Sequence, residues 1–337
     1  MYYADLVDIY GKLESTSKRL DKIYFISKLL KETPKEDLEI ITLLLQGRLF
    51  PKWDETEIGV SSKYVLRAIK LATGVDEKKI HEEWKITGDL GLVANNLIAK
   101  KKQVTLLSKQ LTVEKVFGNL KKLAKISGEG SVNQKINLIA ELMTSAKPKE
   151  AKYITRTVLE DLRVGVGESS IRDAIVWAYF PKVVGVFFKC SNCNSWMPNV
   201  PKCIECQKEI DTKSEYIGKA LTIENIPELE CDLSKYEVIK GKPEIAREAY
   251  NYLLNIVQQA LDLSNDFGKV AEIAKDKGIK GLKQITINPN HPIKVMLYKK
   301  ALDINDAFEQ VGKPAASFLE PQHETSSTSA TRGRGTP

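Results

Sequence analysis

The amino-acid sequence predicts an all-α protein with one small cysteine-rich insert. Apolar residues recur at the three- and four-residue spacing of amphipathic helices through residues 1–180, and this pattern returns from Pro243. Between these stretches, residues 181–242 are rich in Cys, Pro and Asn and contain short β-like runs such as Val183–Phe188. We therefore expect strands only in the insert and helices elsewhere.

The predicted helices have recognisable starts and stops along the chain. Pro34 and Pro51 fall where helices should begin or end, and Gly74 closes one helical pattern. Ser131, with Gln134 three residues later, has the spacing of a capping box. The expected helical segments are 5–16, 24–34, 36–50, 61–74, 86–101, 111–128, 131–146, 149–165, 169–180, 244–264, 266–278 and 305–312.

One helix start occurs twice. The pattern Asp, apolar residue, Gly, any residue, Val, Ala begins at Asp89 and again at Asp266. The helical stretches before the two copies resemble each other. So do the stretches after them, where 302–304 stands in the place of 111–113. Three similar motifs in the same order indicate a duplicated helical block, and chance similarity among amphipathic helices is the weaker alternative.

The charge balance permits a polyanionic partner without requiring one. The chain has 51 Lys and Arg against 44 Asp and Glu residues, a formal net charge of +7. This charge fits a nucleic-acid partner and a lysine-rich surface about equally well. No run approaches the about 20 apolar residues of a transmembrane helix, and the beginning lacks the basic-then-apolar order of a signal peptide. We expect a cytoplasmic protein with no membrane partner.

A duplicated helix start can offer equivalent groups to the two strands of a duplex. Related helical units tend to pack about an approximate two-fold axis, and duplex nucleic acid has local two-fold symmetry between its strands. Helix N-termini that follow Gly present free N–H groups to an anionic oxygen. A plain helix stop or cap is the alternative at each position, and Asp89 and Asp266 are assigned to capping. The candidate DNA-contacting residues are Thr87, Gly88, Leu90, Gly91, Ser127, Gly128, Gly130, Ser131, Arg163, Gly165, Gly167, Asn265, Phe267 and Gly268.

Four cysteines in the insert have the spacing of metal ligands. Cys190, Cys193, Cys203 and Cys206 form two Cys-x2-Cys steps, and Cys231 stands apart. Two such steps supply the four thiolates of a tetrahedral Zn²⁺ site, which is structural because no coordination position remains open. We expect zinc. Iron in a similar four-sulfur site and an unmetalled loop of reduced thiols are the alternatives.

Several motifs resemble a known family. The sequences GDLGLVA at 88–94, SGEGSVNQKINLIAELM at 127–143 and RTVLEDLRVGVGESSIRDAI at 156–175 are similar to the N-terminal DNA-binding domain of archaeal and eukaryotic-type ATP-dependent DNA ligases. The resemblance covers residues 1–180 and about 243–316 in the family's order. It implies an all-helical, pseudo-two-fold domain that lies across the minor groove of nicked duplex DNA, largely through backbone contacts.

The resemblance also implies a domain organisation and a biological setting. Such ligases act in DNA replication, repair and recombination, and the partners implied are nicked double-stranded DNA, a sliding clamp, and a catalytic ligase chain in trans. A relic ligase domain that serves as a zinc-containing protein-interaction module is the alternative. The expected parts are a first helical half at 1–180, a zinc-knuckle insert at 181–242, a second helical half at 243–312, and a linker remnant with a disordered tail at 313–337.

The sequence departs from the family at two points. The family's nucleotidyl transfer starts at a lysine in a Lys-x-Asp-Gly motif, which takes AMP from ATP in the presence of Mg²⁺. No such motif occurs here, and the nearest string, Lys52-Trp53-Asp54-Glu55, lacks the glycine. We therefore expect a chain truncated before the catalytic domain, which binds neither ATP nor Mg²⁺ and has no catalytic residue. The second departure is the cysteine cluster, which the family does not usually carry.

Overall fold

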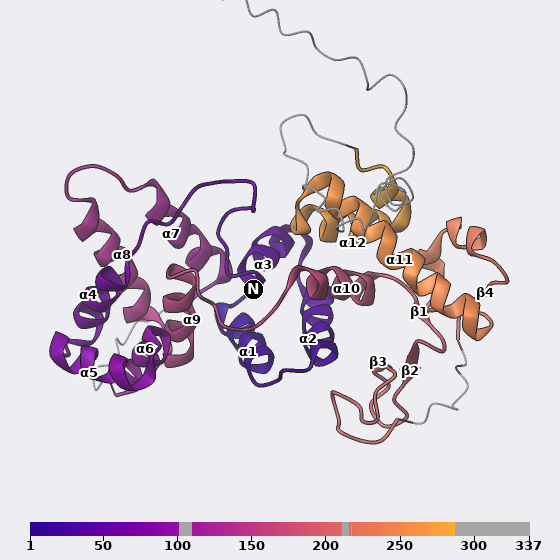
Figure 1. Cartoon of the computed structure of the whole chain (residues 1–337), viewed down its shortest axis with the longest axis horizontal. Helices are drawn as coiled ribbons and strands as arrows, with labels where there is room; N and C mark the ends of the chain where they lie inside the picture. The colour runs from indigo at the N-terminus through magenta and orange to yellow at the C-terminus, as the bar shows by residue number, and fades with distance from the viewer. Residues whose placement is uncertain (101–109, 211–215, 217, 287–337) are drawn as a thin grey trace, which may run out of the picture. The chain divides into compact units, whose positions relative to one another are not determined.

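The computed structural model describes four stretches of the chain (Figure 1), namely residues 1–100, 110–210, 216 and 218–286. They belong to one compact unit, Met1–Lys294, and a second unit, Val295–Pro337, lies wholly outside them. Three sequence expectations fall outside the described residues, namely the repeat counterpart at 302–304, the helix at 305–312 and the tail at 313–337.

Helices make up most of the described chain. The α-helices are α1 (Tyr3–Glu14), α2 (Arg19–Glu32), α3 (Leu38–Leu45), α4 (Ser62–Thr73), α5 (Glu77–Thr87), α6 (Leu90–Ala99), α7 (Val113–Lys125), α8 (Ser131–Ser145), α9 (Pro148–Val158), α10 (Glu168–Tyr179), α11 (Pro243–Ser264) and α12 (Phe267–Lys283). Short 3₁₀ turns are η1 (Lys35–Asp37), η2 (Ile226–Glu230) and η3 (Leu233–Lys235). No helix in the described ranges is long and apolar enough to cross a membrane.

The strands are few and short. They are β1 (Lys182–Val183), β2 (Phe187–Lys189), β3 (Trp196–Pro198), β4 (Ala220–Thr222) and β5 (Val238–Lys240). All five lie in the expected insert, so the protein is helix-rich with a small β component. Elsewhere in the described ranges, the only β pairing is an isolated bridge between Tyr2 and Thr112.

The helices pack as two groups that do not follow the order of the chain. In the first group, α4 packs on α8, and α6 packs on α9. In the second group, α10 packs on α2, and α12 packs on α3. The second group therefore combines helices that precede the insert with helices that follow it, and the packing crosses the sequence boundary expected at residue 180.

The two groups have equivalent packing patterns. The helices α4 to α9, taken in order, correspond to α10, α11, α12, α1, α2 and α3. Under this correspondence α4 packs on α5 as α10 packs on α11, and α5 packs on α6 as α11 packs on α12. In the same way, α7 packs on α8 as α1 packs on α2. Contacts between the groups obey the same rule, because α3 packs on α7 as α9 packs on α1. The second helix group thus starts at α10 and is completed by the N-terminal helices α1, α2 and α3. Its helix order is a circular permutation of the order in the first group.

The β bridge between Tyr2 and Thr112 joins equivalent positions of the two groups in the described part of the helical body. Tyr3 N donates to Leu111 O at 2.8 Å, and Val113 N donates to Met1 O at 3.1 Å, so the two strands exchange equivalent hydrogen bonds. The structure therefore places residues 1–3 opposite 111–113. The following helices bury the same register of side chains, namely Tyr3, Leu6, Tyr10 and Leu13 in α1, and Val113, Val116, Leu120 and Leu123 in α7.

The insert closes on itself before the chain returns to the helical body. Strand β1 pairs in parallel with β5, with Lys182 beside Val238, so the two ends of the insert lie side by side. Strand β4 adds to the other edge of β5. Strands β2 and β3 form a separate antiparallel pair, with Phe188 opposite Met197. The insert can therefore be accommodated between α10 and α11 without displacing either helix.

Candidate functional site

The duplicated helix starts are N-capped as the sequence predicts. The Asp89 carboxylate accepts a hydrogen bond from Gly91 N at 2.7 Å at the start of α6. The Asp266 carboxylate accepts one from Lys269 N at 3.0 Å at the start of α12. In each case the side chain satisfies an N–H group that the first helical turn leaves without a partner.

The glycine two residues after each cap allows a neighbouring helix to approach closely. A Cβ on Gly91 would lie 2.8 Å from both Arg156 Cγ and Lys152 O on α9. A Cβ on Gly268 would lie 2.6 Å from Glu39 Cα on α3. Both glycines are buried, as is Leu90. The repeated Asp-apolar-Gly motif therefore joins α6 to α9 and α12 to α3.

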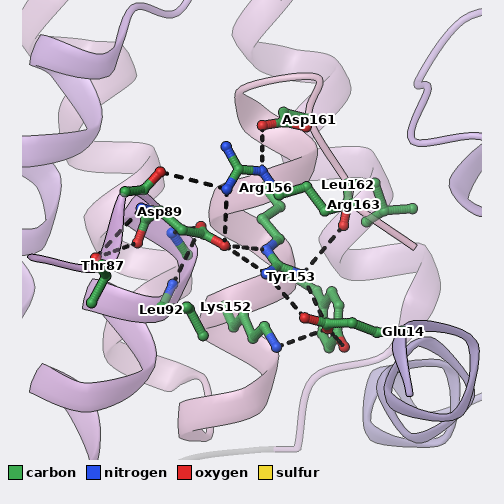
Figure 2. A network of polar contacts seen from close by, with 12 residues as sticks. Glu14, Thr87, Asp89, Leu92, Lys152, Tyr153, Arg156, Asp161, Leu162 and Arg163 are labelled. Atoms are coloured by element: carbon green, nitrogen blue, oxygen red, sulfur yellow. Dashed lines mark hydrogen bonds and ion pairs between the residues drawn. The ribbon is translucent and has the colours of Figure 1, made fainter. Parts of the chain in front are cut away.

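A buried arginine, which sequence reasoning missed, connects the first of these helix starts to α1 (Figure 2). Arg156 is 4% exposed, and its Nε and Nη2 donate to Asp89 Oδ2 at 3.0 and 2.6 Å. Its Nη1 donates to Glu14 Oε2 at 3.1 Å, an oxygen that also accepts from Lys152 Nζ at 2.8 Å and Tyr153 Oη at 2.7 Å. No local motif marks these residues, since α1, α6 and α9 are distant in sequence.

The network keeps both carboxylates ionised. Burial raises the pKa of Glu14, but the hydrogen bonds from Lys152, Arg156 and Tyr153 outweigh it and lower that pKa to about 2. Burial likewise acts against ionisation of Asp89, and Arg156 holds its pKa below the usual value. At the corresponding start of α12, a Cβ on Gly268 would meet Glu39 and Thr42 of α3, whereas a Cβ on Gly91 would meet Arg156.

Two of the predicted turns meet beside this network. Arg163 has a positive φ of 59° and is half-exposed. Its Nε donates to Asp161 Oδ2 at 2.6 Å, and its Nη1 lies 3.5 Å from Gly88 O and from Asp89 Oδ2. The turn that precedes α10 is thereby held against the turn between α5 and α6 (Figure 2). No atom of the described chain comes within 4 Å of a Cβ built on Gly88.

The turn before α10 has a counterpart before α4 that sequence reasoning missed. Lys22 Nζ donates to Val164 O and Gly165 O at 2.7 and 3.0 Å. Lys135 Nζ donates to Ile58 O and Gly59 O at 2.8 and 3.1 Å. The two glycines have φ of 61° and 63°. The signal in the sequence is short, Ile-Gly-Val-Ser against Val-Gly-Val-Gly, and it becomes visible only when α4 and α10 are known to correspond.

Two stretches of predicted positions, 127–131 and 265–268, are separate from this pair of turns. Gly130, with φ 79°, is the N-cap of α8, so Ser131 is the first helical residue and the expected capping box with Gln134 is not formed. Ser127, Gly128 and Gly130 are exposed. At the other site, Asn265 ends α11 with φ 49°. Neither stretch is linked to residues 87–91 or 163–167 by a hydrogen bond or ion pair in the described part of the chain. Three candidates remain. The hydroxyl of Thr87 donates to Glu83 O at 2.9 Å, and Phe267 is partly buried against the core. Gly167 is exposed and is the N-cap of α10.

The four predicted metal ligands come together. Their sulfur atoms all lie within 4.8 Å of one another, with Cys190 to Cys206 at 3.6 Å and Cys193 to Cys203 at 3.5 Å. A tetrahedral zinc site with bonds of about 2.3 Å places its sulfurs about 3.8 Å apart, so the ligand geometry fits. Cys231 is exposed and is not part of the cluster.

The two Cys-x2-Cys steps have the same backbone geometry. Asn194 N donates to Cys190 O at 2.8 Å, and Gln207 N donates to Cys203 O at 2.9 Å. Both donor residues have φ near 60°, at 59° and 60°. Each step is therefore a tight turn that directs both of its sulfurs toward the other step.

The second cysteine step is attached to the helical body. Glu205, between Cys203 and Cys206, accepts hydrogen bonds from Tyr24 Oη at 2.9 Å and Lys28 Nζ at 2.8 Å on α2. The hydrogen bond from Lys28 lowers the pKa of Glu205. These contacts give the insert a defined place against α2.

Comparison with known proteins identifies the family. Residues 1–176 match the family model described as DNA ligase N terminus. A DNA ligase of Methanothermobacter thermautotrophicus is 34% identical over 324 residues, which are 96% of this chain and 45% of the relative. DNA ligases of Nanoarchaeum equitans, at 35% identity, and Thermococcus onnurineus, at 33%, match 94% of this chain and 43% and 44% of their own lengths. The chain thus spans less than half the length of these relatives, and it belongs to the DNA ligase N-terminal family.

Proposed function

We propose that this chain binds nicked duplex DNA through phosphate and minor-groove contacts, as the DNA-binding part of an ATP-dependent DNA ligase in replication, repair and recombination. The observation that carries the proposal is the pair of glycine turns, 58–62 and 164–168, which lie in equivalent places at the starts of α4 and α10. Duplex DNA has local two-fold axes between its strands. A protein with the same symmetry can place one turn on each strand.

The chemistry of the turns suits phosphate oxygens. Each turn leads into a helix, α4 or α10, whose first N–H groups and dipole attract an anion. Arg163 adds a half-exposed guanidinium beside one of them. Contacts to phosphate and sugar position a protein without reading bases, so binding should show little sequence preference. Of the predicted residues, the proposed surface keeps Gly88, Arg163, Gly165 and Gly167 at its centre. Thr87, Ser127, Gly128, Gly130, Ser131, Asn265 and Phe267 are proposed at its margins, and Leu90, Gly91 and Gly268 support it from inside.

A salt-dependent titration with nicked and intact duplexes of one sequence tests this function. The affinity for nicked duplex should fall linearly with salt on a double-logarithmic plot, with a slope of about −0.9 for each phosphate neutralised. A second duplex of scrambled sequence should bind equally well. An affinity that does not change with salt would contradict the proposal.

We also propose that the four insert cysteines hold one zinc ion as a structural centre. A bound ion would cross-link the two turns and fill its four positions with thiolates, leaving none for a reactant. Metal analysis of protein purified under reducing conditions should give one zinc per chain. Iron would instead give visible thiolate-to-metal absorption. Protein with no metal would leave only the loop of reduced thiols.

A second candidate function concerns the insert, which could act as a protein-interaction module. Residues 181–242 carry as many acidic as basic residues, so no net charge draws this segment to DNA. In that case the helical body would be a relic of a ligase domain. Failure of the helical body to bind nicked duplex at low salt, with the zinc site intact, would favour this candidate.

A further inference from the structure

We propose that Lys22 and Lys135 are positioning residues that hold the two DNA-contacting turns in place, and that neither ammonium group contacts a phosphate. This inference rests on the proposed function. It assigns two cations, which would ordinarily be counted as phosphate ligands, to the support of the backbone behind the binding surface.

The geometry is the same in both helix groups. Each lysine lies near the N-terminal end of its helix, Lys22 in α2 and Lys135 in its counterpart α8. Each Nζ donates to two successive carbonyls, those of Val164 and Gly165 at 2.7 and 3.0 Å, and those of Ile58 and Gly59 at 2.8 and 3.1 Å. Two of the three ammonium donors are thereby used inside the protein.

Engaging those carbonyls turns the adjacent N–H groups outward. In a trans peptide the C=O of one residue and the N–H of the next point in opposite directions. When Val164 O and Gly165 O face Lys22, the N–H groups of Gly165 and Val166 face away from it. Within the described ranges neither N–H has a hydrogen-bond acceptor. The same holds for Gly59 and Val60 opposite Lys135.

Glycine leaves room for the ammonium group at both turns, so that a side chain there would have to displace the lysine from its two carbonyls. A Cβ on Gly165 would lie 2.7 Å from Lys22 Nζ, and a Cβ on Gly59 would lie 3.0 Å from Lys135 Nζ. Positive φ also favours glycine at both places. Both helix groups have the lysine, the glycine and the turn in equivalent places. This agreement indicates that the two turns share a task.

The test compares Lys22→Met and Lys135→Met with Lys79→Met, which removes an exposed lysine of α5 and controls for lost charge. Loss of two hydrogen bonds to a turn should weaken binding of nicked duplex by about tenfold in each variant. The slope of affinity against salt should stay within about half a unit of wild type, whereas loss of a phosphate contact lowers it by about 0.9. Lys79→Met should change neither quantity.

Amide hydrogen exchange gives a readout that does not depend on DNA. The readout comes from the hydrogen-bonded amides directly after each turn. Those of Ser170 and Ile171, which donate to Gly167 O, should exchange faster in Lys22→Met. Those of Tyr64 and Val65, which donate to Ser61 O, should do so in Lys135→Met, with the other turn unchanged in each case. Lys22→Arg and Lys135→Arg keep a charged donor and should restore most of the affinity. They also provide a measurement if a methionine variant does not fold.

Each outcome supports or overturns the assignment. A slope lower by about 0.9 in either methionine variant would make that lysine a phosphate ligand. Unchanged affinity together with unchanged amide exchange would remove any positioning role. If the wild-type protein itself does not bind duplex DNA, the proposed function fails, and the exchange measurement still decides whether the lysines order the turns.

Discussion

At the scale of single residues, the Arg156 network shows how a cap becomes part of a tertiary contact. Asp89 is a local N-cap, but Arg156 also joins it to Glu14 at the end of α1. Removing one partner of a buried ion pair costs more than the pair contributes, because the remaining charge stays buried without compensation. The network therefore stabilises the fold only when all of its charged partners are present.

Replacing Arg156 by Met should lower the free energy of unfolding by about 3 kcal/mol, since Asp89 is left as a buried carboxylate that only its own helix start and the half-exposed Arg163 satisfy. Urea denaturation followed by circular dichroism measures the change. The matched variant Arg172→Met, whose guanidinium contacts Asp173 from a more exposed position, should cost less. Equal costs for the two variants would contradict this ranking.

The same network predicts a pH dependence. Glu14 has a folded pKa of about 2 against an ordinary value of 4.5. A carboxyl whose pKa is depressed by folding contributes stability above its unfolded pKa and loses that contribution as pH falls through the folded pKa. Unfolding free energy should therefore decline between about pH 4.5 and 2, and the decline should be smaller in Glu14→Gln. A decline of the same size in both proteins would exclude Glu14 as its source.

Gly91 gives a third residue-scale prediction. Gly91→Ala should destabilise the protein by about 1–3 kcal/mol, because its Cβ meets the Lys152 carbonyl, which belongs to the backbone and cannot easily move. Gly118 in α7 is the control, since a Cβ there meets no atom within 4 Å. Gly118→Ala should stabilise the helix by up to about 1 kcal/mol. Thermal unfolding of the two variants would show shifts of opposite sign.

At the scale of elements, we expect the folding of the insert to depend on the proposed zinc ion as well as on side-chain packing. Its strands are two or three residues long, and the sulfurs of its two cysteine turns lie within 4.8 Å of one another. By contrast, α11 and α12 pack directly on α10. Insert residues such as Phe187 and Leu229 lie in the same core as the helices, but we expect the helix–helix packing to keep the body folded when the cysteine turns lose order.

Removing the metal should unfold the cysteine turns and leave the helices intact. Treatment with a strong chelator should abolish the protection of residues 190–208 from proteolysis while the helical circular dichroism stays nearly constant. Cys206→Ser should behave like chelated protein, whereas Cys231→Ser should bind metal as wild type does. A collapse of the helical signal on chelation would show that the cysteine turns and the helical body unfold together, which would contradict this prediction.

At the scale of the whole molecule, the circular permutation means that the N-terminal helices complete a unit begun after α9. The 337-residue chain contains no Lys-x-Asp-Gly sequence, the motif in which the family resemblance places the lysine that accepts AMP, so we expect no nucleotidyl transfer by these residues. Incubation with labelled ATP and Mg²⁺ should leave no covalent AMP on the protein. A denaturation-resistant label that maps to a lysine, such as Lys52 or Lys313, would overturn this expectation.

The sequence by itself determined the local features of this protein. Helical periodicity, the caps at Asp89 and Asp266, the glycine stop at Gly74 and the two cysteine steps depend on residues close along the chain, so their signals are readable there. The capping box expected at Ser131 failed because Gly130 in a left-handed conformation took the N-cap position. The change in composition at 181–242 predicted where strands occur, and all five described strands lie in that range.

Only the tertiary structure decided which helices meet and what the shared motifs do. An apolar stripe shows that a helix face is buried, but not against which partner. Nothing local reveals that α1 corresponds to α7 or that residues 58–62 repeat 164–168. The burial of Gly91 and Gly268, the place of Arg156 between two carboxylates, and the inward use of Lys22 and Lys135 all depend on groups far away in sequence. Their physical cause is the packing of one unit against its permuted copy.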